Sequence, residues 1–152
     1  MLETIKNYRK ITDKLHTAAQ PTVDEFESIK QAGIEVVINL ARADSPDAII
    51  NEVQIAQEQG LDYINIPVDF KKPERSDLSQ FCYTMEQHIN NTILVHCAFN
   101  WRVSCFVYLY RVIKQNCDNE TAKQDMLAVW QPDETWQGFI DDCLSAPENI
   151  KQ

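Results

Sequence analysis

The sequence predicts an α/β fold of three layers, in which a parallel sheet of four to five strands is flanked by helices. Two observations predict this class. Short apolar runs alternate along the chain with longer segments of helical period, as expected of strands joined by helical crossovers. The centres of 35–40 and 92–96 are consecutive apolar residues, which is typical of strands buried on both faces. The length of 152 residues fits one domain, 1–152.

The first third of the chain predicts two strands with a helix between them. Residues 14–18 can form a short first strand. Thr22 with Glu25 three positions later is a capping box, which predicts a helix to about residue 32. Gly33 ends this helix. The β-branched run 35–40 is the next strand.

The following segment predicts a second helix and a third strand. Ser45 as N-cap and Pro46 as the first helical residue predict a helix over about 47–59. Gly60 stops it, and the apolar run 63–66 is the next strand.

The second half of the chain begins with a polar stretch, 67–75, which leads into a third helix over about 76–90. The run 92–96 is the strongest signal for a buried strand in the chain. From about 102 to 115 the apolar residues recur at helical spacing. Two more helices are predicted near 119–130 and 133–144.

Charge and cysteine content exclude several classes of function. The net charge of −9 argues against a general nucleic-acid or anionic-membrane surface, because such partners require stripes of Lys and Arg. No apolar run approaches the roughly 20 residues that span a bilayer, and the first residues do not resemble a secretory signal. Five scattered cysteines form no metal-binding pair. We therefore expect free thiols, a cytoplasmic location, and neither a metal nor another cofactor.

Cys97 stands between the strongest strand and a helix, the position at which open α/β sheets bind ligands. A helix N-terminus offers unpaired N–H groups and about half a positive charge to an anion. The same field favours the thiolate form of a nearby cysteine. Arg102 can offer a planar fork to oxyanion oxygens, and we expect Ser104 to donate a hydrogen bond to the sulfur. The predicted anion-binding residues are Ala98, Phe99, Asn100, Trp101, Arg102 and Val103.

The order His96, Cys97, Arg102, Ser104 resembles the signature loop of cysteine-dependent phosphatases of the dual-specificity type. Three further runs resemble a bacterial phosphatase-like family first noticed beside β-lactamase-like hydrolases: Ala19-Gln20-Pro21-Thr22, Val37-Ile38-Asn39-Leu40, and Tyr63-Ile64-Asn65-Ile66-Pro67-Val68. The resemblance implies a cysteine-phosphatase-like fold and hydrolysis of phosphate monoesters through a cysteinyl-phosphate intermediate. Cys97 would be the nucleophile, and Arg102 would stabilise the transferred oxygens. The substrate is then a phosphorylated molecule of unknown class, and the oligomeric state stays open.

The loop differs from the phosphatase pattern in length, with four residues between Cys97 and Arg102 where the family has five. In one alignment Arg102 is functional on a shortened loop. In the other, Val103 occupies the arginine position, which implies an inactive pseudophosphatase that still binds oxyanions. A four-residue spacing also resembles rhodaneses, which implies sulfur transfer as a third hypothesis. Asn100 stands where the family usually has glycine, and Asn tolerates positive φ best among other residues.

A cysteine phosphatase needs an acid that protonates the leaving oxygen, usually an Asp on the loop before the third helix. Asp69 lies just past the strand 63–66 and is our candidate. Asp77 is better explained as a charge at a helix N-terminus, and Asp133 as an N-cap. By resemblance, His96 orients the loop through backbone contacts. Three basic residues of the loop are candidates for steering an anion to the pocket: Lys71, Lys72 and Arg75.

Overall fold

A five-stranded sheet forms the centre of the computed structural model, which describes residues 1–150. Its strand order is β1-β2-β5-β3-β4. The bounds are β1 Arg9–Lys10, β2 Leu15–Ala18, β3 Val36–Asn39, β4 Asp62–Asn65 and β5 Ile93–His96. Four strands run parallel, but β1 is antiparallel to β2. The predicted parallel sheet of four to five strands is therefore confirmed by β2, β5, β3 and β4. The strand β1 was not predicted, and it is antiparallel because the few residues between β1 and β2 allow only a reversal of the chain.

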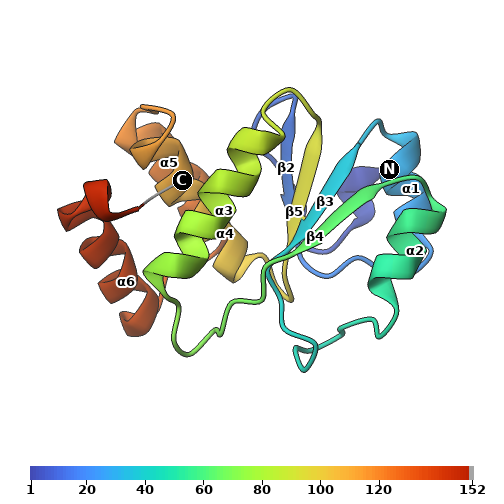
Figure 1. Ribbon diagram of the computed structural model, residues 1–152, viewed down its shortest axis with the longest axis horizontal. Coiled ribbons are helices and arrows are strands. Elements are labelled where there is room, and N and C mark those ends of the chain that lie inside the picture. Colours follow the sequence, from blue (N-terminus) through green and yellow to red (C-terminus); the bar gives the residue numbers. More distant parts are fainter. Residues whose placement is uncertain (151–152) are drawn as a thin grey trace.

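Helices cover both faces of the sheet and complete the three predicted layers (Figure 1). The 3-10 helix η1, α1 and α2 lie on one face, and α3 to α6 lie on the other. Their bounds are η1 Leu2–Thr4, α1 Glu25–Gln31, α2 Glu52–Glu58, α3 Arg75–Gln87, α4 Trp101–Ile113, α5 Asn119–Val129, α6 Glu134–Ser145 and η2 Pro147–Asn149. Within residues 1–150, no helix combines the length and the apolar character needed to cross a membrane.

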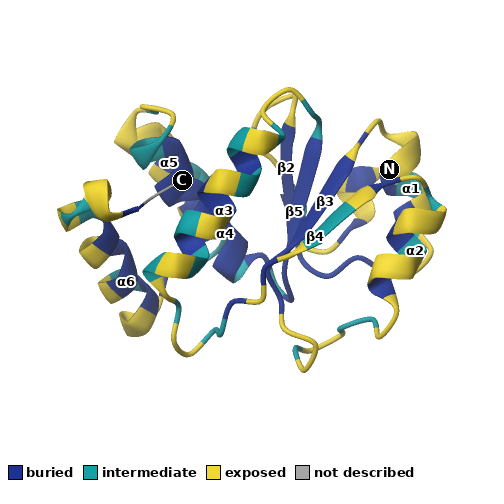
Figure 2. Cartoon of the chain, viewed as in Figure 1, coloured by how far each residue is buried: buried dark blue, intermediate teal, exposed yellow. Residues whose placement is uncertain are grey.

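The central strands alternate their side chains between two hydrophobic clusters. Val36 and Ile38 pack under α3 to α6, whereas Val37 packs under α1 and α2. In β5, Val95 packs under α3 to α6, and Leu94 packs under α1 and α2. Figure 2 shows that β2, β3 and β5 are buried along their length, while the edge strand β4 is partly exposed. Burial on both faces explains why these strands read as continuous apolar runs.

The second helix is much shorter than predicted. α2 begins at Glu52, and the preceding residues form a loop rather than a first helical turn. The Ser45 hydroxyl accepts a hydrogen bond from the backbone N–H of Arg42 at 3.1 Å, and Asp47 has a φ of 63°. A left-handed residue interrupts a right-handed helix, so the prediction of Ser45 as N-cap is wrong. The loop instead stays beside the carboxyl end of β3.

Other helix starts follow their predicted capping chemistry. The Thr22 and Glu25 pair forms both bonds of the capping box, at 2.9 and 3.4 Å, although α1 itself starts at Glu25. Asp77 accepts from the backbone N–H of Glu74 at 3.2 Å, which confirms its structural role at the start of α3. Asp133 accepts from the N–H of Trp136 at 2.9 Å and caps α6, as predicted.

Candidate active site

The loop that follows β5 turns at Asn100, where α4 begins. Asn100 is fully buried and has a φ of 71°, so the expectation that it replaces a glycine at a positive φ is confirmed. Its side-chain amide donates to the backbone carbonyl of Asn7 at 2.9 Å and to the Thr17 hydroxyl at 3.0 Å. These bonds tie the turn to the N-terminal segment and to β2, so the loop is held from outside the pocket.

The carbonyl groups of the loop are held by donors from three different parts of the chain. They pair as Cys97 O with His96 Nδ1 at 3.3 Å, Ala98 O with Gln20 N at 3.2 Å, and Phe99 O with Asn7 Nδ2 at 3.0 Å. The peptide bonds of residues 1–150 are all trans, and a trans peptide points its N–H opposite to its C=O. The N–H groups of residues 98–100 therefore point away from these donors, toward the pocket side of the loop.

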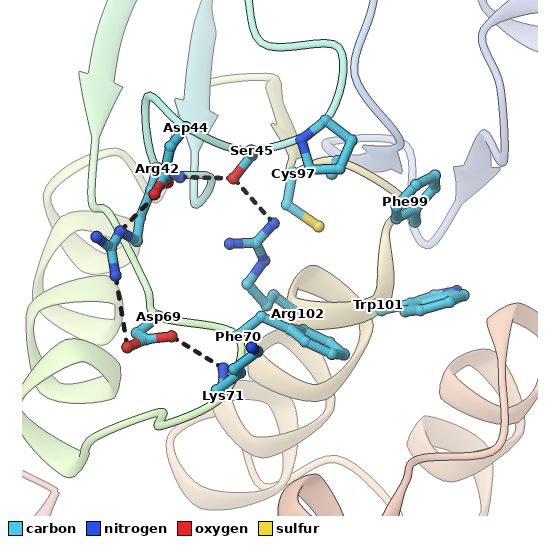
Figure 3. A pocket seen from close by; sticks show the side chains of 12 residues that line it. Arg42, Asp44, Ser45, Asp69, Phe70, Lys71, Cys97, Phe99, Trp101 and Arg102 are labelled. Atoms are coloured by element: carbon cyan, nitrogen blue, oxygen red, sulfur yellow. Dashed lines mark hydrogen bonds and ion pairs between the residues drawn. The ribbon is translucent and has the colours of Figure 1, made fainter.

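A pocket of about 440 Å³ opens beside this loop. Its walls come from the loops after β3, β4 and β5, which all end at one edge of the sheet (Figure 3). The lining residues are Arg42, Asp44, Ser45, Pro46, Asp69, Phe70, Lys71, Cys97, Ala98, Phe99, Trp101 and Arg102. A pocket beyond the carboxyl ends of parallel strands is where such folds bind ligands.

Arg102, and not Val103, lies in this pocket. Figure 3 shows its guanidinium beside the Cys97 sulfur, donating to the backbone carbonyl of Val68 at 2.8 Å and to the Ser45 hydroxyl at 3.4 Å. Val103 has no exposed surface and packs in the hydrophobic core. The alignment that puts Val103 in the arginine position is therefore wrong, because that side chain points into the protein.

Ser104 does not make the bond expected of it. Its hydroxyl donates to the backbone carbonyl of Trp101 at 2.8 Å and accepts from the indole N–H of Trp130 at 3.0 Å. The expected donation to the Cys97 sulfur is therefore wrong, since the single hydroxyl hydrogen is directed into the helix. The bond instead holds Trp130 in a stack on Trp101, with ring centroids 4.9 Å apart.

Aromatic rings form the rim on one side of the pocket. Phe70 lies 5.9 Å from Trp101, and Phe99 lies 5.2 Å from the same ring. The ammonium of Lys6 sits 4.8 Å from the centroid of Phe99. The rim thus offers flat apolar surfaces beside the polar floor at Cys97 and Arg102.

Asp69 lines the pocket, and its side chain is about half exposed. One carboxylate oxygen lies 3.4 Å from Arg42 Nη1, and the other accepts from the backbone N–H of Lys71 at 3.0 Å. Figure 3 shows the carboxylate turned toward these partners. Of the three basic residues predicted to steer an anion, only Lys71 lines the pocket, and Arg75 is instead paired with Asp142 of α6 at 2.9 Å.

The contribution of the segment 42–46 was missed from the sequence. Arg42, Asp44, Ser45 and Pro46 all line the pocket, whereas the sequence pattern placed the last two at a helix start. The position of this segment in the sequence could have revealed its role, because it directly follows β3, and β3 pairs with β5. The carboxyl ends of neighbouring parallel strands meet at one edge of the sheet.

Below the loop, His96 is completely buried and makes the backbone contact with Cys97 that was expected. Its Nε2 lies 2.6 Å from a carboxylate oxygen of Glu52. Burial alone would raise the pKa of Glu52, but the bonds to His96, Gln20 and Tyr63 outweigh it and lower that pKa below its usual 4.5. Within residues 1–150, no three His, Cys, Asp or Glu side chains cluster closely enough to hold a metal ion.

This fold and pocket define a class: α/β phosphatases of the dual-specificity and tyrosine type. Residues 5–137 match the family described as DSP-PTPase phosphatase fused to NAD+ kinase. The chain therefore belongs to this phosphatase family, and the resemblance stated from the sequence is confirmed. Among the curated proteins, no sequence matches this chain.

Solved structures agree with this assignment. A phosphatase-class DUF442 protein from Shewanella putrefaciens CN-32 is 32% identical, covers 95% of each chain and has a TM-score of 0.85. Tk-PTP in its active form, at 12% identity, covers 90% of this chain and 95% of its own, with a TM-score of 0.75. The core catalytic domain of the S. cerevisiae PP-IP phosphatase SIW14, at 14% identity, covers 96% and 94%, with a TM-score of 0.73. At these low identities the last two show a shared fold alone.

Proposed function

We propose that this protein hydrolyses phosphate monoesters with Cys97 as nucleophile, through a cysteinyl-phosphate intermediate. One observation carries the proposal: Cys97 and Arg102 line the same pocket, at a loop whose carbonyls are all held on the other side. Amides on the pocket side and a guanidinium with a planar fork match the equatorial oxygens of a transferring phosphoryl group. The family to which the chain belongs supports the same activity.

The reaction has two steps. In the first, the Cys97 thiolate forms a bond to phosphorus while the bond from phosphorus to the leaving oxygen breaks. A proton goes to the leaving oxygen, and the alcohol departs. In the second, a water oxygen attacks phosphorus, the S–P bond breaks, orthophosphate leaves and the thiolate is restored. Arg102 and the amides of 98–100 stabilise the charge on the non-bridging oxygens in both steps.

Asp69 supplies the proton in the first step and accepts one from water in the second. It stands on the loop after β4 at the wall of the pocket, and a half-exposed carboxyl group can exchange protons with solvent between turnovers. Arg42 and the Lys71 amide hold its position.

Turnover of an aryl phosphate by the purified protein tests the proposal. Cys97→Ser should abolish phosphate release, and a radiolabelled phosphoryl group should be trapped on wild-type Cys97 after acid quenching. Cys117→Ser is the matched control, since Cys117 is a free cysteine outside the pocket. Phosphate release that persists in Cys97→Ser would overturn the proposal. Thiosulfate and cyanide in the same series test sulfur transfer, which predicts a persulfide on Cys97 and no phosphate release.

A further inference from the structure

A buried polar couple lies directly below the candidate nucleophile. His96 ends β5 and has no exposed surface, and Glu52 opens α2 with only 4% of its surface exposed. Their side chains meet at 2.6 Å between Nε2 and Oε2. A buried carboxylate is costly unless it is paired and hydrogen-bonded, so the couple requires an explanation beyond packing.

Both ring nitrogens of His96 face acceptors. Nδ1 lies 3.3 Å from the backbone carbonyl oxygen of Cys97, which can only accept, and Nε2 faces the Glu52 carboxyl. A neutral imidazole carries one N–H and can satisfy only one of these contacts. The other contact then requires a second proton, either on the ring or on the carboxyl group.

The surroundings of Glu52 assign this proton to the ring. Gln20 Nε2 donates to Oε1 at 2.6 Å, and the Tyr63 hydroxyl donates to Oε2 at 2.8 Å. The Tyr63 oxygen itself accepts from Asn39 Nδ2 at 3.0 Å, so its hydrogen is directed to Glu52. Burial and the Glu52 charge raise the pKa of Tyr63, which keeps it a donor. Every neighbour of the carboxyl group is thus a donor, which favours the ionised form.

The adjacent strands place no ionisable side chain beside His96 that could compete with Glu52 for its charge. The residues paired with His96 are Ala18 on β2 and Asn39 on β3, and neither ionises. Within residues 1–150, Tyr63 of β4 is the titratable side chain bonded to the couple, and Cys97 is the next residue along the chain. The positive charge of the ring therefore lies closest to the Glu52 carboxylate and the Cys97 loop.

We propose that Glu52 is a positioning residue that holds His96 as an imidazolium carrying protons on both ring nitrogens. The imidazolium donates to the Cys97 carbonyl, fixes the first peptide of the loop, and favours the thiolate of Cys97 by its charge. This inference deepens the proposed function. It rests on that function in one respect, which is that the Cys97 thiolate acts as the nucleophile.

Nitrogen NMR of the histidine rings tests the protonation state in the unmodified protein. Both ring nitrogens of His96 should show the imidazolium signature at neutral pH. His88, which is only partly buried and lies at the opposite end of the sheet, provides a reference signal in the same spectrum. A His96 ring with a single N–H at neutral pH would overturn the proposal without any variant.

Alkylation of Cys97 by iodoacetamide, followed by peptide mass spectrometry across pH, tests the effect on the thiolate. In Glu52→Gln the midpoint, which is the pH at which alkylation of Cys97 reaches half of its maximal rate, should rise by about one unit. Glu58→Gln removes the same charge from the exposed end of the same helix and should leave the midpoint unchanged. Equal midpoints in wild type and Glu52→Gln would refute the proposal.

The three buried thiols outside the pocket interfere little with this measurement. Burial raises the pKa of Cys82 and of Cys105 to about 12 and that of Cys143 to about 11, so these react slowly near neutral pH. Because alkylation reads the sulfur directly, it stays informative if the protein hydrolyses no phosphate ester. That outcome would remove the proposed function and leave the role of Glu52 to be decided by the midpoints.

Discussion

The Asn100 side chain donates to the backbone carbonyl of Asn7 at 2.9 Å, while the Asn7 side chain donates to the carbonyl of Phe99 at 3.0 Å. This reciprocal clasp joins the N-terminal segment to the Cys97 loop. It also explains how a loop without glycine is stable. The side chain at the left-handed position supplies hydrogen bonds that compensate for the conformational cost.

The clasp predicts unequal effects of two substitutions at position 100. Asn100→Ala loses the bonds and keeps a Cβ at a φ of 71°, so it should destabilise the fold by about 2–4 kcal/mol. Asn100→Gly loses the bonds but relieves the strain, and should cost about 1–2 kcal/mol. Urea unfolding of both variants measures the difference. A glycine variant less stable than the alanine variant would contradict this account.

Arg102→Lys should show that geometry matters beyond charge. Lysine keeps the positive charge but cannot bind the Val68 carbonyl, the Ser45 hydroxyl and a phosphoryl oxygen through one planar fork. We expect kcat/KM for an aryl phosphate to fall by at least about 100-fold. Arg75→Lys, at an arginine paired with Asp142 outside the pocket, is the control and should retain activity. Full activity in Arg102→Lys would argue against the proposed mechanism.

Asp69→Asn should affect poor leaving groups most. An alkyl phosphate needs protonation of the leaving oxygen, so its kcat should drop about 100-fold or more. A nitrophenyl phosphate needs little protonation and should lose much less. Asp44→Asn is the matched control, because Asp44 lines the same pocket and also pairs with Arg42, at 3.5 Å. If Asp44→Asn shows the larger loss on the alkyl phosphate, the acid is Asp44 instead.

Stability should depend on pH through Glu52. Its folded pKa is lowered below 4.5 by His96, Gln20 and Tyr63 against the effect of burial. The stabilisation is therefore present above the unfolded pKa and is lost as pH falls through the folded one. Glu52→Gln should be less stable than wild type at neutral pH, and the difference in free energy of unfolding should narrow at a pH well below 4.5. Urea midpoints at both pH values measure this, and a gap that stays constant would contradict it.

The sequence was most informative where one local rule decides the structure. The apolar centres of β3 and β5, the Asp133 cap and the positive φ of Asn100 each depend on nearby residues. Cys97 and Arg102 were located in the same way, from a strand followed by a helix. The choice between Arg102 and Val103 was not local, because it depends on which side chain the core accepts.

Long-range contacts account for what the sequence did not reveal. The Ser45-Pro46 pair satisfies the local rule for a helix start. The Ser45 hydroxyl instead accepts hydrogen bonds from the Arg42 backbone N–H and from the Arg102 guanidinium. Glu52 meets His96 across 44 positions of sequence, and no spacing rule predicts such a pair. Ser104 was assigned to the sulfur from proximity in sequence, whereas its hydroxyl donates to the Trp101 carbonyl within α4 and accepts from Trp130, which lies 26 positions further along the chain.

A crystal structure of the protein with bound tungstate tests the central claim most directly, because this tetrahedral oxyanion imitates a phosphoryl group. The account predicts the ion above Cys97, with its oxygens within hydrogen-bond distance of the N–H groups of 98–100 and of the Arg102 guanidinium. An empty pocket at saturating tungstate, or an ion bound with those N–H groups directed elsewhere, would contradict it.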